Sequence, residues 1–516
     1  MKCLKKLIFF HFNVAIFSAL AAGTCVASQT LDQRVMKFEK GLRPALYLQG
    51  TTPPRWTIEE RMAHYKIPGM SLAIIENGAV VFAKGYGTKA ANEAALVDTK
   101  TVFNVASLSK VGTAATILSL VAKDTLTLNV PVNKYLKTWQ IADTSYTKDY
   151  PVTLRGIMAH TAGLTVHGFP DINPGERLPT LLNTLNGTAP AQTDAVINDY
   201  MPGTRWRYSG GGTTVLELLI EDVSGSTFTA AAKSGVFDKL GMKRTTFQSP
   251  LPKSFGNIAK AHDEKGQVTA LPRGWQTFPQ SAAAGLWSTP TDFATLMISF
   301  MDSYQGEKGA FLPQYLAQDM MTEVGISPFG LGPLLDGSGV KRRFSHGGAN
   351  GSYKAWMEGH LETKSGIVIF TNVVAGYELL VEIRHAIADA FSWPFYQTIN
   401  IPRLTTAPAT LNPLVGNYQF PLTSPNATER YFTRTPATDK TIAFTLTDGQ
   451  LWLGKNLLTP TGPLQFIMKD RFWTKDFYTI SSESTRVQFT RGLDGNIKGV
   501  TFSTLDSYIE FSKITS

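Results

Sequence analysis

Residues 103–110 read Phe-Asn-Val-Ala-Ser-Leu-Ser-Lys and lead into a run of small and apolar residues that ends at Ala122. This stretch places Ser107 and Lys110 in a Ser-x-x-Lys pair at the start of a strongly apolar predicted helix. Because residues i and i+3 lie on one face of a helix, the two side chains can touch. Burial lowers the pKa of a lysine, so Lys110 can accept the proton that a serine must lose to become a nucleophile. The stretch therefore predicts a serine nucleophile with a lysine base.

A Ser-x-x-Lys pair alone is weak evidence, because a chain of this length should contain roughly one or two by chance. The alternative is that Ser107 caps a helix and that Lys110 lies on its surface. A second pair, Ser145 and Lys148, lies in a polar, turn-rich segment with no apolar helix behind it. We interpret this second pair as a chance match.

The start of the chain has the pattern of an export signal over residues 1–27. Three lysines precede an apolar run at 7–22, and small residues lead to a cleavage position before Ser28. The run is short for a membrane-spanning helix, so we expect a periplasmic or secreted protein without a transmembrane segment in the mature chain. Acylation of Cys25 as a lipoprotein is the less favoured alternative, because Thr24 fits poorly before such a cysteine.

Composition excludes several classes of function. Both cysteines, Cys3 and Cys25, lie in the leader, so the mature chain has no disulfide, thiol nucleophile or cysteine metal site. The histidines are scattered and no His-Glu-x-x-His occurs, and we expect no metal or cofactor. Removing the three leader lysines lowers the net charge from +9 to +6. Without a basic run or zinc finger this charge does not favour nucleic-acid binding, although it is compatible with an anionic cell envelope.

The pattern of predicted elements favours an α+β fold after the leader. Asn77-Gly78 between two β-rich runs, 70–75 and 79–83, predicts a hairpin. Residues 105–300 are mainly helical and loop-like, with a helix that begins after the N-cap Thr289 and runs to about 301. Strands at 340–345, 354–361 and 366–371 and a helix at 378–391 follow. This order predicts an antiparallel sheet flanked by helices, with a separate helical lobe.

The pattern changes after residue 400. Prolines and threonines at 401–413 predict an extended linker between a first domain, 28–400, and a last domain, 414–516. Short alternating strands separated by turns predict an antiparallel β-barrel or sandwich in the last domain. The predicted strands are 416–420, 430–433, 441–447, 450–453, 464–468, 472–474, 486–490, 497–503 and 508–511.

Tyr208 stands just before a run of three glycines, Gly210 to Gly212. We expect this run to form a tight loop that aims the tyrosine hydroxyl into a cleft. Near a lysine the phenol would lose its proton more readily and could act as a general base. The alternative is a tyrosine that packs at a turn.

His346, Gly347 and Gly348 form the third candidate segment. Strand residues alternate between two faces, so only every other side chain here can face a cleft. The two glycines allow close approach of the backbone and leave N–H groups free to bind an anion. The alternative is a strand that leads into a glycine-rich turn.

The order of the three segments resembles the penicillin-recognising serine hydrolases, a superfamily that includes class C β-lactamases, DD-carboxypeptidases and family VIII carboxylesterases. Residues 67–71, 157–164 and 284–289 also resemble stretches of this family, and the absence of Gly-x-Ser-x-Gly argues against an α/β-hydrolase. The resemblance covers about residues 50–395. The last domain resembles the lipocalin-like barrels that are often appended to this family.

The resemblance implies a role for each matched residue. Ser107 would be the acylated nucleophile, Lys110 its proton partner and Tyr208 the general base. His346 stands where the family usually has lysine, in a position that orients substrate and tunes the tyrosine. The backbone N–H groups of Ser107 and Ala349 would form the oxyanion hole.

Two departures from the family pattern concern substrate recognition. The usual Tyr-x-Asn has Gly210 in place of asparagine, and the usual Lys-Thr-Gly reads His346-Gly347-Gly348. Both changes weaken recognition of carboxylates and side-chain amides and leave the acylation residues intact. His160, also at a family position, is interpreted as structural.

We therefore predict an exported serine hydrolase that acts through an acyl-enzyme on a small-molecule ester, amide or peptide, as an esterase or peptidase. One alternative is a β-lactamase or DD-carboxypeptidase that acts on β-lactams or peptidoglycan stem peptides. An alternative of another class is a catalytically silent envelope-binding protein.

Overall fold

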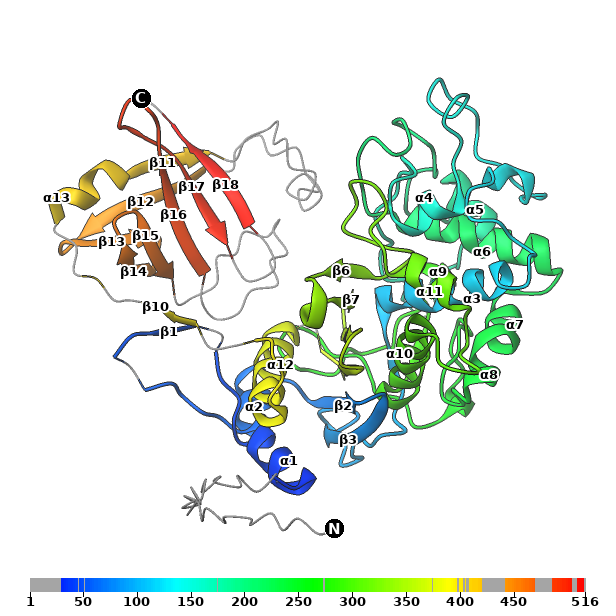
Figure 1. The fold of residues 1–516 in the computed structure, drawn as a ribbon, viewed down its shortest axis with the longest axis horizontal. Helices are drawn as coiled ribbons and strands as arrows, with labels where there is room; N and C mark the ends of the chain where they lie inside the picture. The colour runs from blue at the N-terminus through cyan, green and yellow to red at the C-terminus, as the bar shows by residue number, and fades with distance from the viewer. Residues whose placement is uncertain are drawn as a thin grey trace, which may run out of the picture.

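The computed structural model describes residues 29–514, except for residues 45, 51, 174, 272–273, 374, 397–398, 402–403, 405–407, 420–440, 469–484 and 504–507. The predicted signal and the predicted strands at 430–433 and 472–474 lie outside the described residues. The described residues form an α+β domain and a closed β-barrel that lies beside it (Figure 1).

The centre of the α+β domain is a six-stranded antiparallel sheet in the order β3-β2-β9-β8-β7-β6. The predicted hairpin is confirmed, because Asn77 and Gly78 have φ of 52° and 73° and join the first two strands. The sheet thus combines strands from both ends of the domain. Its strands are β2 (Gly69–Glu76), β3 (Ala79–Gly87), β6 (Leu334–Asp336), β7 (Arg343–Ala349), β8 (Lys354–His360) and β9 (Ser365–Thr371).

Helices cover both faces of this sheet because its central strands are apolar on both sides. In β2, Leu72 and Ile74 pack with α12 (Tyr377–Phe391), while Ala73 and Ile75 pack in the core that contains α10 (Pro290–Gln305). The predicted start of α10 is confirmed, since Thr289 caps it by accepting a hydrogen bond from the Asp292 N–H. On the α12 side lie also α1 (Leu31–Glu39) and α2 (Ile58–His64).

A helical lobe accounts for much of residues 105–300, as predicted, and α11 (Gln314–Met320) adds to it beyond that segment. Its central helix, α3 (Ser109–Val121), is buried at every residue from Ser109 to Ser119. This helix contacts α6 (Gly210–Ser224) and the short α9 (Ser281–Ala284), and Figure 1 shows the three together in the lobe. The other helices are α4 (Leu154–Met158), α5 (Leu181–Asn186), α7 (Phe228–Ala232) and α8 (Asp238–Leu240).

Two short strand pairs complete the domain. One joins β4 (Phe103–Asn104) to β5 (Trp287–Ser288), and the other joins β1 (Leu46–Leu48) in parallel to β10 (Ile399–Ile401). Across the described part of the chain, we find no helix with the length and apolar character needed to cross a membrane.

Two expectations for this domain need correction. The strand expected at 340–345 begins later, because Gly339–Lys341 forms a 3₁₀ turn and β7 runs over Arg343–Ala349. The segment expected to be an extended linker starts at the end of β10 and contains α13 (Pro408–Leu411). A proline is accommodated at the first position of a helix, so Pro408 starts this helix instead of preventing it.

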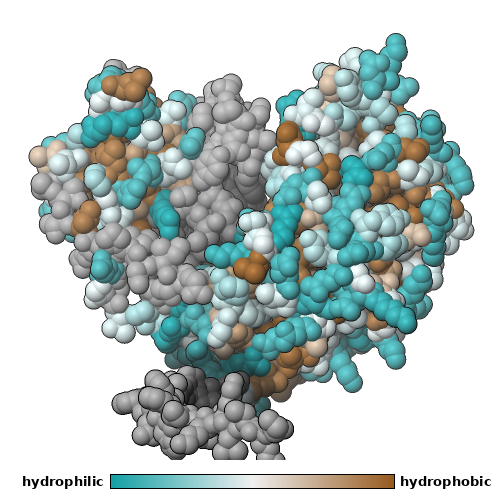
Figure 2. Space-filling model, in the orientation of Figure 1, coloured by the Kyte–Doolittle hydropathy of each residue, from teal (hydrophilic) through white to brown (hydrophobic). Residues whose placement is uncertain are grey.

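The last domain is a closed barrel of eight antiparallel strands in chain order, in which β11 pairs with β18. Alternate side chains point inward, as in β12, where Ile442 and Phe444 are buried between exposed neighbours. Figure 2 shows hydrophilic residues over much of the visible surface, with smaller hydrophobic groups between them. The strands are β11 (Gly416–Gln419), β12 (Thr441–Thr447), β13 (Gln450–Leu453), β14 (Asn456–Gly462), β15 (Gln465–Met468), β16 (Thr485–Arg491), β17 (Ile497–Ser503) and β18 (Tyr508–Lys513).

Candidate active site

Ser107 lies in a 3₁₀ turn, Ala106–Leu108, immediately before α3. Ala106 has φ of 46°, in the left-handed region that non-glycine residues rarely adopt. The Asn104 Oδ1 atom fixes this turn by accepting hydrogen bonds from the Ala106 N–H and from Asn350 Nδ2, both at 2.9 Å. The turn leaves Ser107 half-buried between buried neighbours, so its hydroxyl is held at an accessible point.

Lys110, one turn further on, contacts Ser107 as predicted. Its Nζ donates to Ser107 Oγ at 3.3 Å and to the Ala283 carbonyl oxygen at 2.8 Å. Burial of the ammonium group lowers the pKa of Lys110 to about 7. At neutral pH a large share of this lysine is therefore the free amine, which can accept a proton.

Tyr208 approaches the same serine from the segment before α6. Its hydroxyl lies near enough to that of Ser107 for the serine to stabilise the phenolate, and Lys110 Nζ lies 4.8 Å from the centre of its ring. Burial raises the pKa of Tyr208, which is the opposite of our expectation. The desolvation of a phenolate outweighs the attraction to a lysine that is itself partly neutral. In the resting site Lys110 can therefore accept a proton as the free amine, whereas Tyr208 is a protonated hydroxyl.

His160 holds the ring of Tyr208 in place. It has φ of 62°, and its Nδ1 accepts a hydrogen bond from the Ser209 N–H at 3.2 Å. The His160 and Tyr208 rings lie 4.2 Å apart, and Phe329 packs against both. Burial lowers the pKa of His160, so it is a neutral packing group at neutral pH. This contact is consistent with the structural role expected from the sequence.

The three glycines after Tyr208 form the first turn of α6, and not the expected tight loop. Ser209 caps this helix, since its Oγ accepts the Gly212 N–H at 2.8 Å. A Cβ atom at Gly210 would lie 2.9 Å from the His167 carbonyl oxygen and 3.1 Å from the Phe169 ring. The position that carries asparagine in the family pattern is therefore closed by the backbone of a neighbouring segment.

His346 lies on β7, with its ring centre 6.1 Å from that of Tyr208. Its Nδ1 lies 2.8 Å from the Gly347 carbonyl oxygen, so this nitrogen carries the hydrogen of the neutral ring. The opposite nitrogen, Nε2, is buried and has no hydrogen-bond partner among the described residues. Burial and the nearby Lys110 lower the pKa of His346 to about 4. At neutral pH this position presents an uncharged acceptor.

Gly347, Gly348 and Ala349 are strand residues that pair with β8, which corrects the expectation that their N–H groups are all free. Successive N–H groups of a strand point to opposite edges. The edge of β7 that faces away from β8 pairs with β6 only at 343–345. Its later residues therefore have no paired strand on that edge among the described residues, and Ala349 is exposed. A Cβ at Gly348 would lie 2.1 Å from the Val105 carbonyl oxygen, so β7 packs directly on the Ser107 turn. This contact suits an oxyanion hole built from the Ser107 and Ala349 amides.

A side chain at Gly347 would face the side of the sheet opposite to that of Gly348. A Cβ at this position would lie 3.0 Å from the Tyr377 hydroxyl and 3.5 Å from the Trp356 ring. The face of Gly347 that an added Cβ would occupy is therefore filled by Tyr377 and Trp356, and substrate could approach it only from the other side.

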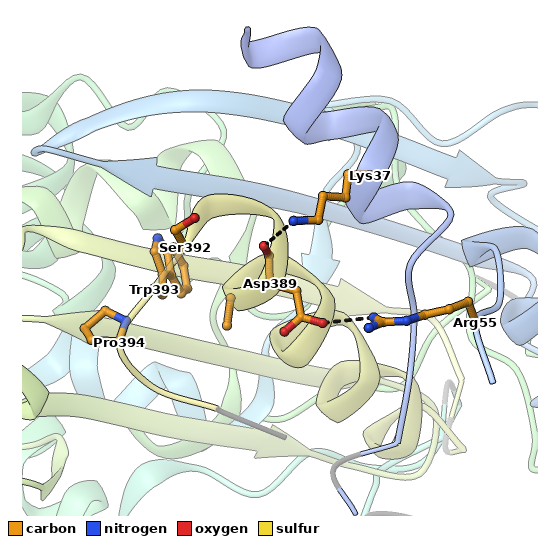
Figure 3. A pocket seen from close by; sticks show the side chains of 7 residues that line it. Lys37, Arg55, Asp389, Ser392, Trp393 and Pro394 are labelled. Atoms are coloured by element: carbon orange, nitrogen blue, oxygen red, sulfur yellow. Dashed lines mark hydrogen bonds and ion pairs between the residues drawn. The ribbon is translucent and has the colours of Figure 1, made fainter. Parts of the chain in front are cut away.

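Two hollows in the described surface lie away from these residues. One of about 510 Å³ is lined by α1 and α12, and Figure 3 shows Lys37 and Arg55 both directed at Asp389. The other, of about 730 Å³, lies around Ile67 and Gly266. Within the described ranges no group of three or more His, Cys, Asp or Glu side chains could hold a metal ion.

Comparison with known proteins agrees with this geometry. A family model described as Beta-lactamase matches residues 55–391, and the chain belongs to this family, within the penicillin-recognising serine hydrolases. "Protein flp" of Staphylococcus aureus (strain MW2) is 26% identical over 239 residues, which are 46% of this chain and 44% of the relative. A "Beta-lactamase" of Lysobacter lactamgenus is 28% identical over 41% of this chain and 51% of its own length. The matches thus span about half the length of these relatives.

Solved structures share the fold. The "octameric penicillin-binding protein homologue from Pyrococcus abyssi" is 19% identical with a TM-score of 0.54, over 88% of this chain and 98% of that chain. The structure titled "Crystal structure of SurE with D-Leu" is 19% identical with a TM-score of 0.53, over 89% of this chain and 97% of that chain.

Proposed function

We propose that this protein is a serine hydrolase that forms an acyl-enzyme on Ser107 and cleaves a small ester or amide. The observation that carries the proposal is the 3.3 Å contact between Ser107 Oγ and a buried lysine whose pKa is about 7. A neutral amine at hydrogen-bond distance is what a serine hydroxyl needs to lose its proton during attack. Tyr208, beside the same hydroxyl, supplies a second proton-transfer group.

The reaction would proceed in two halves. Lys110 takes the Ser107 proton while Oγ attacks the substrate carbonyl carbon, and the Ser107 and Ala349 amides stabilise the oxyanion. As the oxyanion collapses, the bond to the leaving group breaks, Tyr208 gives that group its proton, and the Lys110 ammonium restores the proton of Tyr208. Water then attacks the acyl-enzyme with the same groups acting in reverse, which releases the acid and frees Ser107.

The recognition residues favour an uncharged substrate. His346 is neutral and offers an acceptor nitrogen, whereas a carboxylate needs donors or a positive charge. Gly210 offers no amide, and a side chain at this position would require the His167 backbone to shift. These features support an esterase or peptidase over a β-lactamase or DD-carboxypeptidase. They also leave a complete acylation site, which a silent envelope-binding protein would not need.

Replacement of Ser107 with alanine tests the proposal. Ser107→Ala should abolish hydrolysis of short acyl p-nitrophenyl esters and covalent capture by a fluorophosphonate probe. Ser145→Ala, in the second Ser-x-x-Lys pair, is the matched control and should leave both unchanged. Full activity of Ser107→Ala would contradict the assignment, and strong labelling of Ser107 by a fluorescent penicillin at low concentration would favour the β-lactamase alternative.

We also propose that residues 1–27 direct export to the periplasm or the exterior. The basic start, apolar run and small residues of this segment support the proposal. The intact mass of the protein recovered from the periplasm or medium of expressing cells should then correspond to a chain that begins at Ser28. A full-length chain retained in the cytoplasm would contradict it.

A further inference from the structure

The short helix α9 is bonded through successive carbonyl groups to the segment that carries the nucleophile. The Ala282 carbonyl accepts from Thr113 Oγ1 at 2.9 Å, and that of Ala283 accepts from Lys110 Nζ at 2.8 Å. The Ala284 carbonyl accepts from Asn104 Nδ2 at 3.4 Å. The position of α9 therefore sets where the Lys110 amine is held.

Glu217 on α6 bonds to the opposite end of this helix. Its Oε2 accepts the Ala282 N–H at 2.9 Å, and the adjacent Ser281 N–H also acts on the carboxyl group electrostatically. Glu217 is 7% exposed, in a helix whose residues from Val215 to Ile220 are otherwise apolar. Burying a carboxyl group is costly unless its polar atoms are satisfied, and the Ala282 N–H at the start of α9 supplies a partner for this one.

We infer that Glu217 is a positioning residue for Lys110, acting through α9. The inference rests on the proposed function, because it assigns to Glu217 the placement of the base in that reaction. The path is short: Glu217 holds the Ala282 N–H, and the next residue, Ala283, presents the carbonyl that holds the lysine. Without Glu217, the buried Ala282 N–H at the start of α9 loses its acceptor, and we expect this helix to shift.

Burial, together with nearby Glu221, raises the pKa of Glu217 to about 8. At neutral pH the carboxyl group is therefore largely protonated. Its oxygen still accepts from α9, and the group does not add a negative charge that would raise the pKa of Lys110. Glutamine, which is uncharged and retains one acceptor oxygen, is accordingly the conservative replacement.

Glu221, one turn further along α6, offers a matched control. Its Oε1 accepts the Phe228 N–H at 2.9 Å at the start of α7, so it caps a helix as Glu217 does. Glu221 acts on Glu217 through its charge, but no hydrogen bond or ion pair joins it to α9 or Lys110 among the described residues, so its loss leaves the bond from the Ala282 N–H to Glu217 in place. Replacing each glutamate with methionine keeps the side-chain volume and removes the acceptor.

The test compares Glu217→Met, Glu217→Gln and Glu221→Met with wild type in acylation of Ser107 by a p-nitrophenyl ester across pH. Glu217→Met should acylate about 10²-fold more slowly with little change in KM, because the base is misplaced. The acid limb of its pH–rate profile should move above pH 7, towards the ordinary lysine pKa, because the displaced Lys110 becomes more hydrated. Glu217→Gln should lose only about fivefold, because its amide oxygen can still accept the Ala282 N–H while its NH₂ group replaces the other carboxyl oxygen. Glu221→Met should keep the wild-type rate and acid limb.

A folded Glu217→Met with the wild-type rate and acid limb would overturn the inference, and so would an equal loss in Glu221→Met. Should Glu217→Met not fold, Glu217→Gln decides alone, and a wild-type rate and profile in that variant would overturn it. If Ser107 of the wild type is acylated and the Glu217 variants are acylated equally fast, only the role of Glu217 is refuted. Wild-type protein that never acylates Ser107 refutes the proposed function and this inference together.

Discussion

The proposed acylation region (Ser107, Lys110 and Tyr208) and the proposed recognition region (Gly210 and His346) are built differently. In the first, Lys110 contacts Ser107 and lies near the Tyr208 ring, and burial lowers the pKa of the lysine to about 7. In the second, Gly210 is closed off by a neighbouring segment and His346 presents an unpartnered, neutral nitrogen. Ser107 and Lys110 lie in the turn before α3 and in α3 itself, whereas Gly210 and His346 lie at the start of α6 and on β7. Tyr208, just before α6, joins the two regions, so they can be separated by substitution only residue by residue.

The largest effect should follow from removal of the base. Lys110→Met should slow acylation about 10³-fold, within the range expected for loss of a general base. Lys110→Arg, which keeps a cation that cannot be deprotonated, should be equally slow. Burst kinetics with a p-nitrophenyl ester measure this, and a Lys110→Arg variant that retained activity would show that the charge, and not the free amine, matters.

Loss of the tyrosine hydroxyl should come next. Tyr208→Phe keeps the ring between His160 and Phe329 and should lower kcat/KM about 10²-fold, because only proton transfer is lost. The loss should be smaller for esters with a strongly acidic phenol as leaving group, which departs without a proton. Equal losses for alkyl and p-nitrophenyl esters would argue against proton delivery by Tyr208.

The pH dependence should follow Lys110. Its lowered pKa means that the free amine predominates above pH 7, so kcat/KM should fall about tenfold for each pH unit well below 7. His346 should not contribute to this limb, because its pKa of about 4 keeps it neutral there. A rate profile in the His346→Gln variant separates the two, and an acid limb that disappeared in this variant would transfer the titration to His346.

The smallest effect should be seen in the recognition region. His346→Gln keeps a neutral polar group and should stay close to wild type, while His346→Ala should raise KM about fivefold through loss of one neutral hydrogen bond. Steady-state kinetics with a neutral ester measure both. Equal and large losses of kcat in the two variants would instead indicate that His346 carries a proton in the reaction.

Regular elements of the fold could be predicted from residue patterns. The strands at 441–447, 450–453 and 497–503 have the predicted bounds, since each alternates between buried and exposed residues or follows a clear turn. In contrast, β14 was missed, because Pro460 and Gly462 interrupt the strand pattern and the pairing shifts register between them. Tertiary packing, which the sequence does not display, accommodates both.

The candidate site, too, could be predicted from the sequence only in part. The contact of Ser107 with Lys110 follows from helical spacing and was predictable. The left-handed Ala106 and the burial that raises the pKa of Tyr208 depend on distant residues. The link from Glu217 to α9 joins residues 65 positions apart, and its only sequence signal is an acid within an apolar helix.

The central claim is that Ser107 is acylated by an uncharged substrate with Lys110 as base. Intact-protein mass spectrometry after brief incubation with neutral esters, D-amino-acid peptides and penicillins tests it most directly. We predict an acyl adduct from the esters or from a peptide, mapped to Ser107, absent in Ser107→Ala, and formed faster at pH 8 than at pH 6. An adduct on another residue, rapid labelling by penicillin alone, or no adduct with any of the three classes would contradict the account.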